Sequence, residues 1–305
     1  MKRHQSGVAL VLVLWVITLL TVIAGNFAYS MRGEAQIARN LLSTAQAQAR
    51  ADAGVQLAWF ELLKPASDAL RWQGNGAVHE MLQGGVLLQV SILDESGKID
   101  LNTASDELLK GLFKSAGLDD SASAALTDAV LDWRSPGDLK RLNGAKEPDY
   151  RAAGKNYGPP NAPFETVDEL QRVLGMTPAL YRQLAPALTI YSRQAGINTS
   201  VAPREALLAI PGANLAMVEQ FLAQRQEALA NGQPVPAFSG AGTFSSGGNS
   251  QTYRVRSQAS VPDGSIFVRQ AIGRLSGNAK SPIQLVAWGE GDTQPPVLNN
   301  AMAKN

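Results

Sequence analysis

The sequence of 305 residues contains no cysteine and only two histidines, His4 and His79. Disulfide bridges and thiolate metal sites are therefore excluded. A histidine-based catalytic triad or a multi-histidine metal site would have to depend on His79, because His4 stands in front of a long apolar run. We expect His79 to lie at the surface or in a strand. Conventional hydrolase chemistry is close to excluded, and we expect a protein that is not an enzyme.

The chain also lacks an excess of either charge, with 27 basic and 26 acidic side chains and a net charge of +1. This balance gives no general attraction to nucleic acid and no acidic tail. The hydrophobic fraction of 45% is ordinary for a globular protein. The length suffices for two domains, or for one domain with a large insertion, so most of the chain is expected to bury a core.

No charged side chain falls between Arg3 and Arg32 except the titratable His4, and residues 8–24 are almost purely aliphatic. As a helix this run spans about 26 Å, and its uncharged flanks extend it to the roughly 30 Å of a bilayer core. Basic residues before the run favour a cytoplasmic N-terminus and a translocated remainder. The sequence therefore predicts one membrane-spanning segment.

Three interpretations of this segment stay open. A secretory signal peptide would be cut after small residues, and Ala28 and Ser30 would place the mature start at Met31. An uncleaved signal anchor would retain the whole segment. In the third interpretation a peptidase cuts after Gly7, whose missing side chain permits the extended backbone that a protease cleft needs. The apolar run exceeds the usual 7–15 residues of a secretory signal, which favours the third interpretation.

A helical pattern follows the apolar run without a loop. Residues 32–64 are rich in Ala, Gln, Leu and Arg, and apolar side chains recur there at helical spacing: Ile37, Leu41, Ala45, Val55, Ala58, Trp59 and Leu62. Pro65 is expected to end the helix. A continuous helix from about Val8 to Leu63 would be roughly 80 Å long, lipid-soluble in its first half and amphipathic in its second.

Strand patterns flank a helical block. Strands are expected at residues 85–93, 252–261, 265–275 and 283–288, with a return strand near Ile99 and Leu101. Residues from 102 to about 230 have helical patterns, and residues 234–249 are rich in Gly, Ser and Pro, as in a loop. The predicted fold class is α+β: a long N-terminal transmembrane and stalk helix packed on an antiparallel sheet, with a large all-helical inserted domain.

The helical block contains a repeated pattern, an Asn-Thr start followed by a helix with two leucines, beginning at Ile99 and Ile197. Capping signals accompany these helices: Thr103 with Asp106, Thr166 with Glu169, and Pro203 at an early helical position. The second copy continues through Ile210-Pro211-Gly212 and is similar to a helix-hairpin-helix, which many DNA-binding proteins use to hold phosphates on backbone amides.

The charge balance argues against a DNA-binding role for this hairpin. Residues 196–240 contain two Arg and three Glu, and residues 99–134 contain seven acidic and three basic side chains. A phosphate-binding face needs the opposite balance. The hairpin also has Ala213 after Gly212 and lacks a second glycine. Structural use of the hairpin is favoured, and a membrane-tethered DNA-binding or DNA-uptake protein is the alternative.

Gln5-Ser6-Gly7 before the apolar run resembles the class III signal of type IV pilins and pseudopilins. In that family a prepilin peptidase cuts after the glycine, and the mature chain, here from Val8, is often methylated. Most pilins have a glutamate at the fifth mature position, which is Leu12 in this sequence. The K-type minor pseudopilin typically lacks this glutamate, for the reason usually given that it sits at the tip with no subunit above.

Several spaced elements of the helical block resemble the K-type minor pseudopilin of the bacterial type II (general) secretion pathway in the same order: Leu131-Asp132-Trp133-Arg134, Asp138, Glu147-Pro148-Asp149-Tyr150, and residues 160–170. The last strand pattern, at residues 253–257, also fits. The implied organisation is a prepilin leader peptide at 1–7, a transmembrane and stalk helix at 8–64, a pilin-like β head from 65–101 plus 250–290, an inserted α-domain with helix-hairpin-helix-like repeats at 102–235, and a disordered tail at 291–305.

The resemblance implies a single-pass protein of the bacterial inner membrane whose C-terminal domain lies in the periplasm. It would cap the tip of the pseudopilus and help to initiate its assembly for secretion of folded exoproteins. The implied partners are the I-, J- and H-type minor pseudopilins, the major pseudopilin, the prepilin peptidase and the inner-membrane secretion platform. No nucleic acid is expected.

Calcium is associated with the head of this family, and Ca²⁺ requires hard oxygen ligands in loops. The resemblance makes Asp132, Asp138, Glu147 and Asp149 the candidate ligands. Arg134 and the Ser-Pro-Gly after it stand where further carboxylates often occur, so solvated surface charge is the competing interpretation. No other cofactor or metal is expected.

Overall fold

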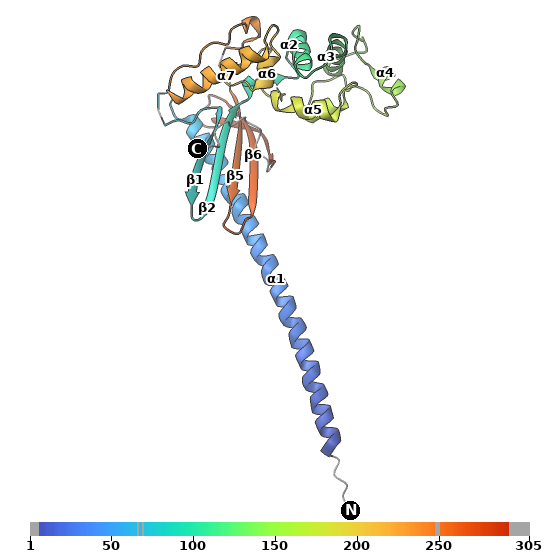
Figure 1. Cartoon of the computed structure of the whole chain (residues 1–305), viewed down its shortest axis with the longest axis vertical. Coiled ribbons are helices and arrows are strands. Elements are labelled where there is room, and N and C mark those ends of the chain that lie inside the picture. Colours follow the sequence, from blue (N-terminus) through green and yellow to red (C-terminus); the bar gives the residue numbers. More distant parts are fainter. Residues whose placement is uncertain (1–5, 66, 69, 248–250, 293–305) are drawn as a thin grey trace, which may run out of the picture.

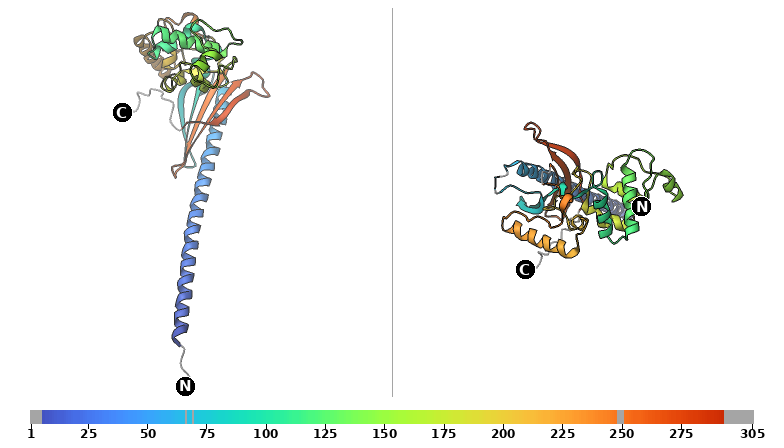
Figure 2. Two further views of the ribbon diagram at one scale, coloured as in Figure 1. Left: turned by 90° about the vertical axis from the view of Figure 1, so that its right-hand side faces the viewer. Right: turned by 90° about the horizontal axis from the view of Figure 1, so that it is seen from above.

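The computed structural model describes residues 6–292 except 66, 69 and 248–250. A long helix leads from the N-terminus to a head in which a five-stranded sheet lies along the upper part of that helix (Figure 1). Helices α2 to α7 lie at the end of the head farthest from the N-terminus (Figures 1 and 2). Most of the predicted leader, and the predicted disordered tail beyond residue 292, lie outside the described residues.

The stalk is one uninterrupted helix, α1, from Ser6 to Leu63. At 1.5 Å per residue its 58 residues extend about 87 Å. It ends two residues before Pro65, which has no amide hydrogen to continue the helical ladder. The predicted continuous helix is confirmed, and it begins two residues before Val8.

The sheet has the order β1-β2-β5-β6-β7, and every neighbouring pair is antiparallel. The strand bounds are Asn75–Gln83 for β1, Val86–Asp94 for β2, Thr252–Ser260 for β5, Ile266–Leu275 for β6 and Ile283–Glu290 for β7. The four predicted strands are confirmed. β1 was not predicted, because its largely polar, half-exposed sequence lacks a strand pattern. His79 lies in β1, as expected, and stacks on Trp72 with ring centroids 4.0 Å apart.

The last five turns of α1 pack against the sheet. Its buried residues recur every three or four positions: Ala47, Ala51, Val55, Ala58, Trp59 and Leu62. Gly54 permits the closest approach, since a Cβ there would lie 2.2 Å from Ser257 Oγ on β5. Asp52 accepts from Arg269 Nε of β6 at 2.5 Å. Apolar packing, a close approach at Gly54 and the ion pair of Asp52 therefore fix the helix on the sheet, and only its upper part is covered.

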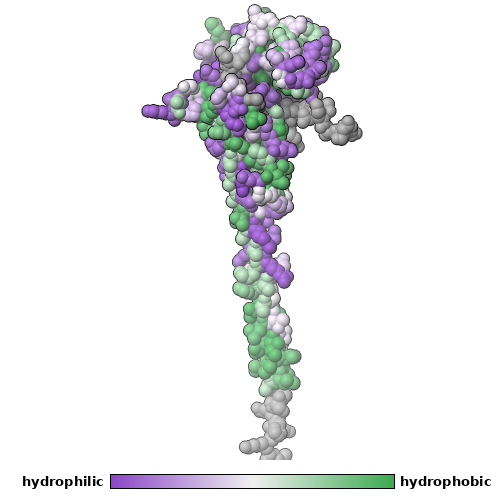
Figure 3. Space-filling view, turned by 90° about the vertical axis from the view of Figure 1, so that its left-hand side faces the viewer, coloured by the Kyte–Doolittle hydropathy of each residue, from purple (hydrophilic) through white to green (hydrophobic). Residues whose placement is uncertain are grey.

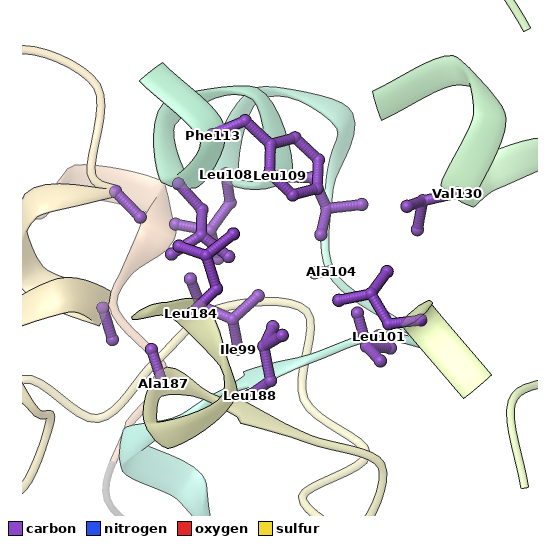
Figure 4. Packing of buried hydrophobic residues seen from close by; sticks show 14 of the residues in the cluster. Ile99, Leu101, Ala104, Leu108, Leu109, Phe113, Val130, Leu184, Ala187 and Leu188 are labelled. Atoms are coloured by element: carbon purple, nitrogen blue, oxygen red, sulfur yellow. The ribbon is translucent and has the colours of Figure 1, made fainter. Parts of the chain in front are cut away.

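The chain leaves the sheet after β2 and returns in the neighbouring strand β5. The helices between them are α2 (Asp106–Ser115), α3 (Asp120–Arg134), α4 (Glu147–Ala152), α5 (Pro178–Leu184), α6 (Arg204–Leu208) and α7 (Leu215–Ala230). The 3-10 turn η1 (Glu95–Gly97) follows β2, and the 3-10 turn η2 (Val167–Arg172) lies between α4 and α5. The helices share one apolar core, part of which Figure 4 shows around Leu109, Phe113 and Leu184.

This segment is mainly helical but not all-helical. β3 (Ile99–Asp100) pairs in parallel with β4 (Leu188–Thr189) as a separate two-stranded sheet. A strand at Ile99 is confirmed, but it pairs with β4 and does not return along β2, and Leu101 lies outside it. The predicted cap at Thr103 is also wrong, because Ser105 accepts from Leu108 N to begin α2. The cap at Glu169 is confirmed by its bond from Thr166 N at 2.9 Å.

Candidate assembly surfaces and the acidic loop

The lower stalk exposes an almost continuous apolar surface. Twelve large hydrophobic side chains from Leu10 to Ile23 are 46–73% exposed, and the most apolar 18-residue window of α1 has a mean hydropathy of 2.4. Figure 3 shows this hydrophobic segment below a more polar upper stalk. Such a surface is stable only in lipid or against other apolar helices. The length and the composition of the helix are compatible with a single-pass membrane anchor. A signal sequence can have the same length and composition.

The predicted processing positions lie at the start of this helix. Gly7 and Val8 are in its first turn. Leu12, at the position where most pilins have a glutamate, is 61% exposed and belongs to the apolar surface. Cleavage after Gly7 stays a prediction. The structure is that of the uncut chain, and it shows the position of the bond between Gly7 and Val8 but not whether a peptidase cuts it.

The four predicted calcium ligands are distributed around the segment between α3 and α4. Asp132 is 1% exposed in the last turn of α3, while Asp138 and Glu147 are exposed. Asp149 is partly buried in the first turn of α4 and accepts from Lys146 N at 2.9 Å. Among residues 6–292 as described, no three His, Asp or Glu side chains form a group that could hold a metal ion.

Three of these carboxylates already have partners within the chain, two of them basic side chains and one a backbone amide. Lys140 Nζ lies 2.8 Å from Asp149 Oδ1, and this hydrogen bond lowers the pKa of Asp149. Arg151 pairs with Glu147. Arg141 N donates to both oxygens of Asp132, at 3.2 and 3.3 Å, although burial still raises the pKa of Asp132.

Lys146 places an ammonium group where the loop presents oxygen atoms. The residue is 4% exposed. Its Nζ donates to Asp132 O at 2.8 Å, to Ser135 O at 3.2 Å and to Asn161 Oδ1 at 2.7 Å. Carbonyl and amide oxygens of this kind are also hard ligands for Ca²⁺. Here the chain's own ammonium group contacts these three oxygens, and the four predicted carboxylates form no group that could hold a metal ion.

A second buried ionic group joins the helical segment to the sheet. Glu95, in η1, is fully buried and accepts from Lys98 Nζ at 3.0 Å, from Arg254 Nε at 2.6 Å and from the Thr189 hydroxyl. Burial alone would raise its pKa, but Lys98 and Arg254 outweigh burial and lower the pKa of Glu95 to about 2. Since Arg254 belongs to β5 and Thr189 to β4, this carboxylate ties the two parts of the head together. No sequence pattern indicated it.

The helix-hairpin-helix formed by α6 and α7 borders an open groove of about 740 Å³ beside α2. Basic side chains line the groove, but Lys114 pairs with Asp120 at 2.7 Å and Arg204 pairs with Glu219 at 2.5 Å. Lys110 also lines the groove, together with the acidic Glu107, so the groove has no strong excess of positive charge for phosphates. The hairpin instead packs on α2, where a Cβ at Gly111 would lie 1.9 Å from Ala209 O.

The lower part of α1 is apolar and long enough to span a membrane, and its upper part packs on an antiparallel sheet. This combination defines a pilin-like subunit, with a helical stalk and a head. A chain in "The Crystal Structure of the GspK-GspI-GspJ complex from enterotoxigenic Escherichia coli Type 2 Secretion System" has the same fold, with a TM-score of 0.57 and 14% identity over 86% of this chain and 99% of that one.

The sequence comparisons give the particular family. Residues 87–193 match the family model of "Type II secretion system (T2SS), protein K". Type II secretion system protein K of Klebsiella pneumoniae is 28% identical over 78% of this chain and 80% of its own length. The protein of the same name from Dickeya chrysanthemi is 24% identical over 74% and 78%. The family model, both curated relatives and the fold relative agree that the chain is similar to the type II secretion system protein K family, the K-type minor pseudopilins.

Proposed function

We propose that this minor pseudopilin caps the tip of the periplasmic pseudopilus and helps to initiate its assembly for type II secretion of folded exoproteins. The observation that carries the proposal is the contrast between the two ends of the molecule. The lower stalk exposes apolar side chains on all sides, whereas helices α2 to α7 lie beyond the sheet at the opposite end (Figure 1). The stalk can join a helical bundle, and the helices at the other end would obstruct a subunit stacked above them.

Burial energy explains why the stalk needs partners when it leaves the membrane. Exposing its twelve large hydrophobic side chains to water would cost on the order of 20 kcal/mol, at about 1.5 kcal/mol or more for each. Equivalent burial among other stalks offsets this cost. We propose the I- and J-type minor pseudopilins as neighbours, since the fold relative comes from a GspK-GspI-GspJ complex. The H-type and major pseudopilins, the prepilin peptidase and the inner-membrane platform complete the proposed partners.

We propose the domain organisation inferred from the sequence, with one extension. The leader is residues 1–7, the stalk 8–64, and the sheet is formed on both sides of an inserted helical domain. That domain was expected at 102–235. Ile99 and Leu101 before it, and Phe238 and Ala241 after it, pack into the same core, so the inserted unit extends beyond both limits. The orientation proposed is cytoplasmic for the N-terminus and periplasmic for the head.

The first test is the intact mass and N-terminal sequence of the membrane-extracted protein, from cells with and without the prepilin peptidase. A start at Val8, with or without methylation, that disappears without the peptidase supports the proposal. A start at Met31, or an uncut chain in both strains, overturns it. Tip capping is tested separately by immunogold labelling of the head on sheared pseudopili, where label along the filament would contradict it.

A further inference from the structure

The loop between α3 and α4, residues 135–146, is fastened to the helices by two basic side chains that belong to the loop itself. Lys146 stands at the end of the loop and is 4% exposed, whereas lysines are almost never buried without partners. Arg141 stands nearer the middle of the loop. Both side chains contact oxygen atoms of other segments, and these contacts show how the charges of the loop are compensated.

The Lys146 ammonium lies at the C-terminal end of α3. Its Nζ donates to Asp132 O at 2.8 Å, to Ser135 O at 3.2 Å and to Asn161 Oδ1 at 2.7 Å. Asn161 presents its amide from a left-handed backbone with φ 55°, which asparagine tolerates better than most residues. Carbonyls in the last turn of a helix lack amide partners and carry the negative end of the helix dipole. Three neutral oxygens therefore satisfy the three donors of this buried cation.

The Arg141 guanidinium lies between carboxylates of two helices. Its NH1 is 2.8 Å from Asp106 Oδ2 in α2 and 4.0 Å from Asp128 Oδ1 in α3. The backbone amide of Arg141 donates to the Asp132 carboxylate in α3 as well. Carboxylates that approach one another raise the energy of the fold unless a positive charge lies between them. Arg141 supplies that charge from within the chain.

Calcium would find a poor set of ligands in this loop. Ca²⁺ takes about six to eight oxygen ligands, among them carboxylates. The three oxygens around Lys146 Nζ are neutral, and the Asp132 carboxylate is packed against the backbone of the loop, since a Cβ at Gly144 would lie 2.0 Å from Asp132 Oδ2. A bound ion would have to displace the buried ammonium, which would lose all three of its hydrogen bonds.

We propose that Lys146 and Arg141 are internal counter-cations that make the folding of the head independent of divalent cations. An ammonium and a guanidinium supply the positive charge that the family resemblance assigns to a calcium ion. A bound ion stabilises a fold only as far as its concentration exceeds its dissociation constant, whereas a side chain of the same molecule is always present. This property belongs to the head alone and does not depend on where the protein lies in a pseudopilus.

The experiment compares the full chain in detergent with Lys146→Ala and with Lys155→Ala, which changes an exposed lysine elsewhere on the helical part and is the matched control. Each protein is stripped with EDTA, and its thermal unfolding is followed with and without millimolar Ca²⁺ or Mg²⁺. Calcium binding to the parent is measured by equilibrium dialysis. Lys146→Ala removes the atoms from Cγ to Nζ, which n-propylammonium can replace. Its uncharged analogue n-propanol shows whether the charge matters.

The melting temperature of the parent is expected to stay within about 1 °C in EDTA, Ca²⁺ and Mg²⁺, without calcium binding in dialysis. Lys146→Ala is expected to melt roughly 10 °C below Lys155→Ala. At about 0.1 M, propylammonium is expected to recover about 3 °C or more of this difference and propanol none.

A calcium-dependent rise in the melting temperature of the parent, or calcium binding in dialysis, overturns the proposal. Equal melting of the two variants also overturns it, because the ammonium would then not hold the loop. A deficit of Lys146→Ala that propylammonium fails to reduce, or that propanol reduces equally, overturns it as well. The measurements on the parent decide the proposal even where Lys146→Ala does not fold.

Discussion

Replacing Lys146 with methionine keeps a long unbranched side chain but removes the ammonium group on which the acidic loop depends. The ammonium binds three oxygens, Asp132 O, Ser135 O and Asn161 Oδ1, within 3.2 Å. Two of these are carbonyls at the C-terminal end of α3, and Asp132 and Lys146 are both almost fully buried. The substitution therefore leaves acceptors that water cannot easily reach.

The magnitude follows from the number of acceptors left unpaired. A buried polar group without a partner costs about 1–3 kcal/mol, and breaking a buried charged contact costs about 3–5 kcal/mol. We expect Lys146→Met to lower the free energy of unfolding by about 3–5 kcal/mol. For a folding unit of 150–250 residues, each 1 kcal/mol corresponds to about 2–4 °C, so the melting temperature should fall by roughly 10 °C.

The assay is thermal unfolding of the full chain in detergent, followed by circular dichroism. Lys155→Met is the control, since Lys155 is exposed and should change the melting temperature little. A Lys146→Met variant that melts within about 2 °C of the parent would refute the reasoning. The same curves with saturating Ca²⁺ or with a chelator test the calcium prediction, because a ligand that binds only the folded state raises its melting temperature.

Two further predictions concern the head. The pKa of Glu95 is lowered to about 2, so its ion pairs stabilise the fold fully above pH 4.5, and this stability, on the order of 3 kcal/mol, is lost as the pH falls from about 4.5 to 2. Glu95→Gln should abolish that part of the acid unfolding profile, and an unchanged profile would contradict the assignment. Gly111→Ala should destabilise the head by at least about 1–3 kcal/mol in urea despite alanine's higher helix propensity, because its Cβ would meet Ala209 O. Gly33→Ala, in open space on α1, should be neutral or slightly stabilising, and equal effects of the two substitutions would argue against the packing explanation.

Patterns that depend on neighbouring residues predicted the stalk and the sheet well. The charge-free aliphatic run, the helical spacing after it and Pro65 predict α1 to its last residue, Leu63. Alternating and β-branched residues predict β2, β5, β6 and β7. The upper part of α1 and the strands β2, β5 and β6 bury a face whose period is visible in their own sequence, and the lower part of α1 is recognised from its unbroken apolar run. β1 was not predicted, because a largely exposed edge strand does not need alternating apolar residues.

The candidate site shows the limit of this approach. The sequence identified the acidic residues around Asp132 as candidate calcium ligands, with solvated surface charge as the competing interpretation. In the structure the backbone amide of Arg141 donates to the Asp132 carboxylate, and the Lys146 ammonium donates to the Asp132 backbone carbonyl; the sequence singled out neither residue. Composition counts charges within a segment, but it does not show which of them meet when α3, the loop and α4 fold onto one another.

The sequence by itself determined the long apolar stalk helix, the antiparallel sheet and the resemblance to K-type pseudopilins, because hydrophobic period and motif order are properties of local sequence. Only the tertiary structure decided that Ile99 pairs in parallel with Leu188, that Glu95 joins the helical segment to β5, and that Leu139 and Leu142 face solvent. The first two features join residues far apart in the chain, and the third depends on no other segment packing over the two leucines. All three are consequences of packing in three dimensions, because the free energy of burial is gained only after distant segments meet.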